Sequence, residues 1–134
     1  MATLDVHVVT PEREIWGGTA QMVVARGIEG ELGILAGHAP VLIRLAISRL
    51  RIQREDGTWE EVVVDGGFLH VTNGADGTRV DVLADGGELA TEVDRDAARS
   101  LAERLEQQRS TAEAPDELET DLARARIRAG LADG

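Results

Sequence analysis

The 134-residue sequence contains no cysteine and almost no aromatic side chains. Without cysteine, the chain cannot form disulfides, use a thiol nucleophile or bind zinc through thiolates. One Phe and two Trp, 2% of the residues, leave few rings on which the bases of single-stranded nucleic acid could stack. A hydrophobic core must therefore be built mainly from the aliphatic side chains that dominate the 43% of hydrophobic residues.

Positive charge and long hydrophobic runs are scarce as well. The chain has 14 basic residues, all of them Arg, against 25 acidic residues, and its formal net charge is −11. Phosphate backbones and anionic membranes are bound through basic side chains, so we expect neither nucleic acid nor a lipid surface as a partner. No apolar run reaches the ~20 residues that span a bilayer, and the N-terminal residues do not resemble a signal peptide. We therefore expect a soluble, cytoplasmic protein without direct membrane insertion.

Residues 1–88 have the pattern of short β-strands. Apolar and polar residues alternate in several segments, for example in Leu4–Val8, which places one face of the strand in a core. Turn signals separate the segments: Asp56-Gly57 predicts a hairpin, and Gly66-Gly67 predicts the end of a strand. Many short strands with this spacing are typical of a β-sandwich or barrel.

Residues 89–134 change to a helical period. One apolar stripe predicts a helix from about Glu92 to Arg109, with a capping box that begins at Thr91. A second helix is predicted from Pro115 to about Gly130. The two stripes consist of Val93, Ala97, Leu101 and Leu105, with Ala98 and Ala102 beside them, and of Leu118, Leu122, Ala125 and Ala129. The sequence thus predicts an α+β protein with a β domain at residues 1–88 and a helical hairpin domain at residues 89–134.

Both stripes are narrow and rich in alanine. At ~25 cal/mol per Å² of buried apolar surface, two such helices alone are marginally stable. We therefore expect the hairpin to dock on the β domain, to dock on a partner, or to move between the two.

The sequence offers little for catalysis. His7, His38 and His70 have spacings that fit no metal motif. His38 has no serine in a nucleophile context to activate, so it is predicted to stabilise a turn or to contact a partner. The paired carboxylates Glu29 and Glu31 have no third ligand at a recognisable spacing, and they are interpreted as a solvated acidic turn or a charged partner contact. We expect neither catalytic residues nor a metal.

Three motifs in order resemble the ε subunit of the bacterial rotary (F-type) ATP synthase. The first and most specific is Glu29-Gly30-Glu31-Leu32-Gly33-Ile34 followed by Gly37-His38-Ala39-Pro40. Val64-Asp65-Gly66-Gly67-Phe68-Leu69-His70-Val71 and Val80-Asp81-Val82-Leu83-Ala84-Asp85 follow at matching positions. The resemblance extends from about residue 4 to residue 85, and the strands-then-hairpin layout agrees with it.

The resemblance implies an antiparallel β-sandwich of about ten strands in a non-catalytic subunit of the central stalk. Such a subunit connects the γ subunit to the c-ring, as a peripheral protein on the cytoplasmic face of the cell membrane. The implied c-ring-facing loop contains Glu29, Glu31, Gly33, Gly37, His38 and Pro40. The candidates for the γ-facing surface are Val41, Leu42, Leu45, Phe68 and His70.

The resemblance also implies that the hairpin is a brake on ATP hydrolysis, which in its extended form reaches the α and β subunits of the catalytic head. Its candidate regulatory residues are Asp94, Arg124, Arg126 and Arg128. Some family members bind ATP through a motif Ile/Leu-Asp-x-x-Arg-Ala, whose aspartate matches Asp94 here while Ala97 replaces the arginine. We therefore expect no cofactor, with regulatory ATP as the alternative.

Two other functions are compatible with parts of the sequence. One is a stand-alone ligand-binding β-sandwich with a helical tail, although the few aromatic rings disfavour sugar stacking. The other is a small hydrolase that uses His38 and Glu31. A screen of metabolites by thermal shift would reveal the first, and loss of activity in His38→Ala would reveal the second.

Overall fold

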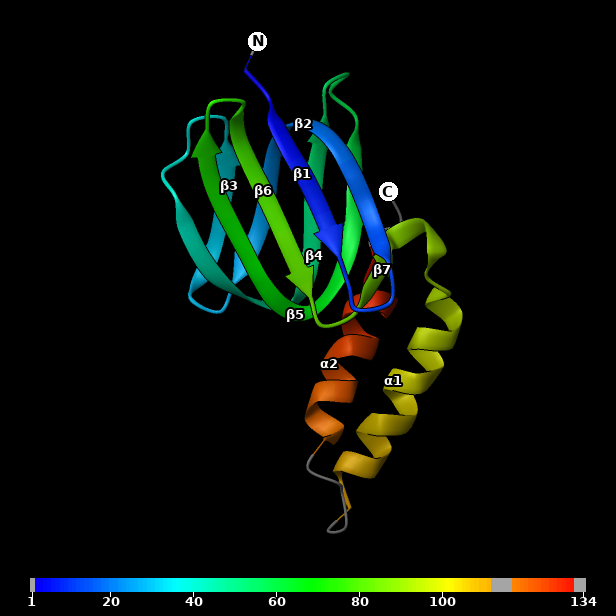
Figure 1. Cartoon of the computed structure of the whole chain (residues 1–134). Coiled ribbons are helices and arrows are strands. Elements are labelled where there is room, and N and C mark those ends of the chain that lie inside the picture. Colours follow the sequence, from blue (N-terminus) through cyan, green and yellow to red (C-terminus); the bar gives the residue numbers. More distant parts are fainter. Residues whose placement is uncertain (1, 112–116, 132–134) are drawn as a thin grey trace. The chain divides into compact units, whose positions relative to one another are not determined.

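The computed structural model describes residues 2–111 and 117–131. The chain forms two compact units, Met1–Leu89 and Ala90–Gly134 (Figure 1). The first unit contains the described strands and the second contains the described α-helices. The two parts of the chain therefore fold around separate hydrophobic clusters.

Residues 2–89, the described part of the first unit, form seven strands. They are β1 (Leu4–Val9), β2 (Glu14–Gly27), β3 (Gly30–Leu35), β4 (Val41–Arg54), β5 (Trp59–Gly74), β6 (Gly77–Ala84) and β7 (Gly87–Leu89). The hydrogen-bonded order is β1-β6-β5-β4-β2-β3, and β1 also pairs with β2. The sheet thus closes on itself through β1, β2, β4, β5 and β6, while β3 is an edge strand on β2 and β7 pairs with β5.

The expected antiparallel sandwich of about ten strands is wrong in two details. Fewer strands occur because β2, β4 and β5 are long, with 14, 14 and 16 residues, and β5 continues through the break that was expected at Gly66-Gly67. Gly66-Gly67 does not end a strand: their φ values of +85° and +117° bend β5, and Gly67 stays paired with Leu45 and Ala84. The sheet is also mixed, since β1 and β6 pair in parallel.

The predicted hairpin at Asp56-Gly57 is confirmed, because these residues lie in the turn that joins β4 to β5. The Asp56 carboxylate accepts hydrogen bonds from the Thr58 amide at 2.9 Å and from its hydroxyl at 2.6 Å. The hydrogen bonds lower the pKa of Asp56, the side-chain bond most. A short polar side chain therefore fixes this turn locally.

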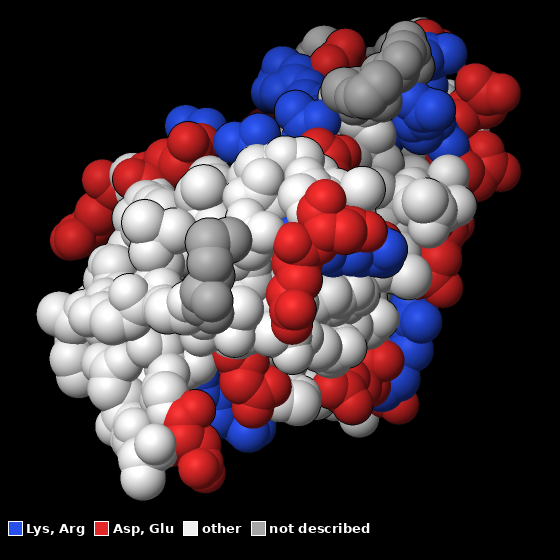
Figure 2. Space-filling view, turned by 90° about the horizontal axis from the view of Figure 1, so that it is seen from above, with Lys and Arg blue, Asp and Glu red and all other residues white. Residues whose placement is uncertain are grey.

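Charged side chains occupy outward-facing strand positions. On the face shown in Figure 2, acidic and basic side chains lie interspersed around a large uncharged area.

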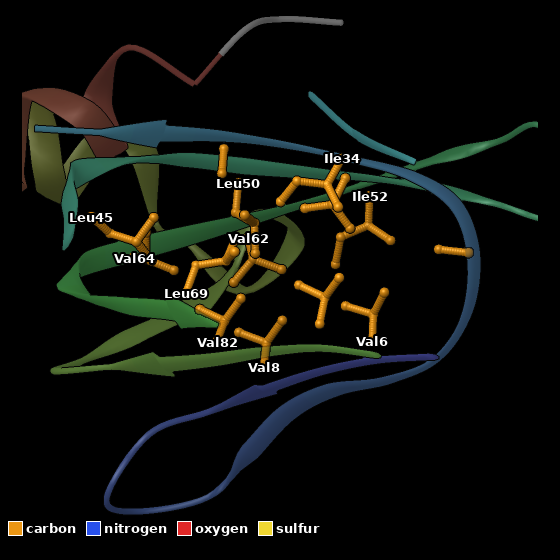
Figure 3. Close-up of a cluster of buried hydrophobic side chains, with 14 of the residues drawn as sticks. Val6, Val8, Ile34, Leu45, Leu50, Ile52, Val62, Val64, Leu69 and Val82 are labelled. Carbon is orange, nitrogen blue, oxygen red and sulfur yellow. The ribbon is translucent and has the colours of Figure 1, made fainter. Parts of the chain in front are cut away.

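Aliphatic side chains fill the core of the first unit (Figure 3). The alternation predicted for Leu4–Val8 is confirmed, since Leu4, Val6 and Val8 are each 0% exposed. Other buried members of the cluster are Ile15, Ala20, Val23, Ala25, Ile34, Leu45, Leu50, Ile52, Val62, Val64, Leu69, Val71, Val80, Val82 and Ala84. The absence of aromatic rings among these members matches the composition of the chain.

The described residues of the second unit form a short 3-10 turn, η1 (Ala90–Glu92), and two helices, α1 (Arg95–Arg109) and α2 (Leu118–Ala129). α1 begins later than predicted because Asp94, and not Thr91, is its N-cap. The Asp94 carboxylate accepts a hydrogen bond of 3.0 Å from the Ala97 amide. The predicted start of the second helix at Pro115 lies outside the described residues. No described helix combines the length and apolarity needed to cross a bilayer.

The cluster within the hairpin is small. Ala102, Leu122 and Ala125 form it, and Leu105 packs against them. The stripe predicted for α2 is confirmed at Leu118, Leu122 and Ala125, all buried. The stripe predicted for α1 is displaced by about one position: Ala98 and Ala102 are buried, whereas Ala97 and Leu101 are exposed.

Candidate functional site

The turn between β2 and β3 carries the first of the predicted acidic contacts. Gly27 pairs with Gly30, which leaves Ile28 and Glu29 as a two-residue turn. The Ile28 amide donates a hydrogen bond of 2.9 Å to the carbonyl of Arg44 on β4, so the turn is tied to a neighbouring strand. Both turn residues are exposed, and the Ile28 side chain is 63% exposed.

A groove of 410 Å³ lies beside this turn. It is lined by residues 27–32 and 42–44. Ile28 and Leu42, each 63% exposed, contribute apolar surface to it, and the charged residues Glu29, Glu31 and Arg44 are also in its lining. The groove therefore combines residues predicted for the c-ring contact with one predicted for the γ contact.

The predicted c-ring-facing residues do not form a single loop. Gly37, His38 and Pro40 lie in the loop between β3 and β4, whereas Glu31 and Gly33 belong to β3 and Glu29 precedes it. The six-residue strand separates its two ends by about 17 Å. These residues therefore form the exposed positions and both ends of one edge strand. A glycine-rich segment with few β-branched residues is a weak strand signal, which is why the sequence suggested a loop.

His38 stabilises its own loop. Its Nδ1 lies 2.8 Å from the carbonyl oxygen of Ala39, which can only accept, so Nδ1 carries the hydrogen. The His38 amide donates to the Leu35 carbonyl at 3.0 Å. The geometry favours the predicted turn-stabilising role over that of a catalytic base.

An outer patch of apolar side chains lies on β4, β5 and β6. It consists of Leu42, Phe68 and Leu83, which are 63%, 47% and 58% exposed. Phe68 is directly opposite Leu83 on β6, and Leu42 is opposite His70, the next outward residue of β5. Side chains that are opposite or diagonal on one face of paired strands lie within reach of each other. Grouped, exposed side chains of this size mark an interaction surface.

Two residues predicted for the γ-facing surface, Val41 and Leu45, face the core instead. Leu45 is 3% exposed, and Val41 packs against the core cluster. Successive residues of a strand face opposite sides, so Val41 and Leu45 share the inner face of β4 while Leu42 faces out. Leu83 was missed, although its alternation with the buried Val82 was a usable signal.

A polar cluster on β1, β2 and β6 was also missed. His7 Nε2 and Nδ1 are each 3.0 Å from a carboxylate oxygen, the first from Asp5 and the second from Glu14. Arg79 extends the cluster, with its Nε 2.9 Å from Asp81 and its Nη1 3.4 Å from Asp5. The hydrogen bond to Glu14 raises the pKa of His7 above 6.5, more than burial lowers it, and the charge of Asp5 adds to the rise. The pairing of β1 with β2 brings Glu14 to His7, and the pairing of β1 with β6 brings Arg79 to Asp5.

The predicted arginines of α2 make contacts within the hairpin. Arg126 donates to the Glu106 carboxylate on α1 at 2.6 and 3.1 Å, which lowers the pKa of Glu106. Arg124 lies 3.7 Å from Asp121 on the previous turn, and Arg128 donates to the Arg124 carbonyl at 3.2 Å. In this conformation the guanidinium groups stabilise the hairpin itself.

Asp94 has a structural role, because its carboxylate caps α1 through the Ala97 amide. Ala97 is exposed where the ATP-binding motif would have its arginine. Among residues 2–111 and 117–131, no three His, Asp or Glu side chains are grouped so that they could hold a metal ion.

Comparison with known proteins agrees with this geometry. Residues 3–90 match the family described as "ATP synthase, Delta/Epsilon chain, beta-sandwich domain". The ATP synthase epsilon chain of Thermobifida fusca is 41% identical over 133 residues, which cover 97% of this chain and 93% of that protein. The epsilon chain of Caldicellulosiruptor bescii is 37% identical over 119 residues, with 89% and 83% covered.

Solved structures show the same fold. A chain of the Euglena gracilis mitochondrial ATP synthase, in a structure of OSCP, F1 and c-ring, has a TM-score of 0.77 at 28% identity, with 95% of this chain and 79% of that chain covered. A chain from the Tetrahymena thermophila central stalk and c-ring has a TM-score of 0.57 at 18% identity, with 95% and 94% covered, and supports the fold alone. The β-sandwich, the two C-terminal helices and the match over residues 3–90 together show that the chain belongs to the ATP synthase delta/epsilon family, among its epsilon chains.

Proposed function

We propose that this chain is the non-catalytic epsilon subunit in the central stalk of a proton-translocating F-type ATP synthase. There it couples the γ subunit to the c-ring and restrains ATP hydrolysis. Epsilon-chain relatives that align over most of the chain support the assignment. The observation on this chain that carries it is the outer patch, Leu42, Phe68 and Leu83, which needs a protein partner to cover it.

The γ subunit is the partner proposed for the outer patch. The patch spans three neighbouring strands, and the exposed His70 lies next to Leu42 in the register. Large apolar side chains at the centre of an interface, with polar groups around them, are the usual energetic arrangement. Val41 and Leu45 would act from the inner face by supporting the strand that presents Leu42.

The c-ring contact is assigned to the edge strand β3 and its two ends. Glu29, Glu31 and Gly33 are exposed along it, and the loop with Gly37, His38 and Pro40 continues the same edge. A contact along about 17 Å of strand would transmit force better than one point, because it resists rotation. If exposed, each ion pair of Glu29 or Glu31 with the ring would contribute about 1 kcal/mol or less.

Residues 89–134 are proposed to be the regulatory part and residues 1–88 the coupling part. The hairpin has a small alanine-rich cluster, so its packing can be exchanged for contacts with the α and β subunits. Arg124, Arg126 and Arg128 would then leave their partners within the hairpin for acidic groups of the head. We place the chain as a peripheral protein on the cytoplasmic face of the membrane and assign it no cofactor.

The γ contact is tested by measuring the affinity of the full chain for the γ subunit of its enzyme. We expect Leu42→Glu and Phe68→Ala each to weaken binding by about tenfold to a hundredfold, since buried anchors are worth about 2 kcal/mol. Leu101→Glu, a control at an exposed leucine of α1, should bind like the parent chain. Unchanged affinity in both patch variants would show that γ does not cover this patch.

A further inference from the structure

The loop at residues 36–40 is held by a short chain of hydrogen bonds from a different part of the sheet. The Gly37 amide donates to the Thr78 hydroxyl at 2.8 Å. Thr78 Oγ1 lies 2.6 Å from Asn73 Oδ1, and Asn73 Nδ2 lies 2.9 Å from the His38 carbonyl oxygen. Two residues of the β5–β6 hairpin therefore contact two consecutive residues of the β3–β4 loop.

The direction of these hydrogen bonds is determined by chemistry. The Thr78 oxygen accepts from an amide, so its own hydrogen is available to the Asn73 carbonyl oxygen. Because Oδ1 of Asn73 is thus an acceptor, the NH₂ group of the same side chain must face the His38 carbonyl, which only accepts. Each of the four groups has the role that its neighbour requires.

Thr78 is the buried member of this chain of hydrogen bonds, whereas Asn73 is exposed. Thr78 is 5% exposed, and it pairs directly with Asn73 at the end of the β5–β6 hairpin. A buried hydroxyl that has satisfied both its donor and its acceptor capacity is costly to displace. Gly37 has a φ of +85°, so the loop also has a backbone geometry that few residues adopt.

We propose that Thr78 and Asn73 are positioning residues that hold the loop at residues 36–40 in the shape that contacts the c-ring. The inference rests on the proposed function, which assigns the loop to that contact. Neither residue needs to touch the ring: both act through the backbone of Gly37 and His38.

Amide hydrogen exchange of the isolated full chain tests whether Thr78 and Asn73 hold the loop, without any partner present. In Thr78→Val the Gly37 amide should exchange about tenfold faster, since one net hydrogen bond of this kind is lost. Thr78→Ser keeps the hydroxyl and should exchange like the parent. The matched control is Thr10→Val, which removes a 7% exposed threonine whose hydroxyl accepts from the amides of Glu12 and Arg13 in another turn. Unchanged exchange at Gly37 in Thr78→Val would overturn the inference.

Coupling is then measured as proton pumping per ATP hydrolysed in the reconstituted enzyme. Thr78→Val and Asn73→Ala should lower this ratio at least about twofold, whereas Thr78→Ser and Thr10→Val should retain it. A loosened loop with full coupling in assembled enzyme would overturn the positioning role. Failure of the parent chain itself to join the enzyme would instead overturn the proposed function, so the two failures are distinguishable.

Discussion

At the scale of single residues, the protonation of His7 depends on two neighbouring carboxylates. Its two ring nitrogens each face a carboxylate oxygen at 3.0 Å. A neutral imidazole has one N–H and can donate to only one of them, whereas the imidazolium donates to both. Both hydrogen bonds, the one to Asp5 within β1 and the one to Glu14 on β2, therefore form together only when His7 is protonated.

The unfolding free energy of the chain should accordingly depend on pH through His7. The pKa of His7 is raised above 6.5 in the folded chain, so its contribution is fully present below pH 6.5 and is lost as the pH rises through the folded-state pKa. Urea unfolding between pH 5.5 and 9 should show stability falling over this interval. Glu14→Gln removes the main cause of the raised pKa, so the unfolding free energy of this variant should change less with pH. The same pH dependence in Glu14→Gln and the parent would contradict the account.

Gly67 is the residue of β5 at which an added side chain would disturb the bend most. A Cβ atom there would overlap the Leu83 carbonyl oxygen, and the φ of +117° disfavours any side chain. Gly67→Ala should lower the unfolding free energy by about 3 kcal/mol or more. Gly74→Ala, where a Cβ meets nothing within 4 Å, is the control and should change it by less than about 1 kcal/mol. Equal stability of the two variants in urea would show that the bend does not need a glycine.

At the scale of elements, the hairpin depends on very few buried side chains. Leu122 is 0% exposed, and among the described residues the buried cluster around it consists of Ala102 and Ala125, with the half-buried Leu105 packed against them. Leu122→Ala should therefore cost about 2 kcal/mol or more. The loss should be local: amides of α1 and α2 should exchange faster while amides of β4 and β5 stay protected. Equal acceleration in both units would mean that the chain unfolds as one cooperative body.

The elements also show what can be predicted from the sequence and what cannot. Alternation in Leu4–Val8 predicts inward faces correctly, because period 2 needs no knowledge of partners. The α1 stripe is displaced because alanines at adjacent positions offer almost equal apolar area, so the pattern does not decide between Ala97 and Ala98. The Gly66-Gly67 pair predicts a break, but pairing with strands on both sides keeps β5 continuous.

The candidate site, too, can be predicted from the sequence only in part. Residues of the edge strand are recognisable as a motif, yet only the register shows that Glu29 and His38 lie at opposite ends of β3. Glu14 lies seven residues from its partner His7, and Thr78 lies 41 residues from its partner Gly37, so local spacing does not predict these two contacts.

At the scale of the whole molecule, the chain combines a barrel-like β unit with a weakly packed hairpin. The β unit has a continuous aliphatic core and presents the outer patch and the edge strand β3 to partners. The hairpin has a separate, small cluster. This contrast supports a division in which the first unit couples two rotor components and the second unit regulates.

Reconstitution of ATP synthase that has been depleted of its epsilon subunit tests this division most directly. ATP-driven proton pumping and ATP hydrolysis would be measured after adding either the full chain or residues 1–88. We predict that both forms restore pumping, and that hydrolysis is restrained by the full chain but at least about twofold faster with residues 1–88. Failure of the full chain to restore pumping, or equal hydrolysis with both forms, would contradict the account.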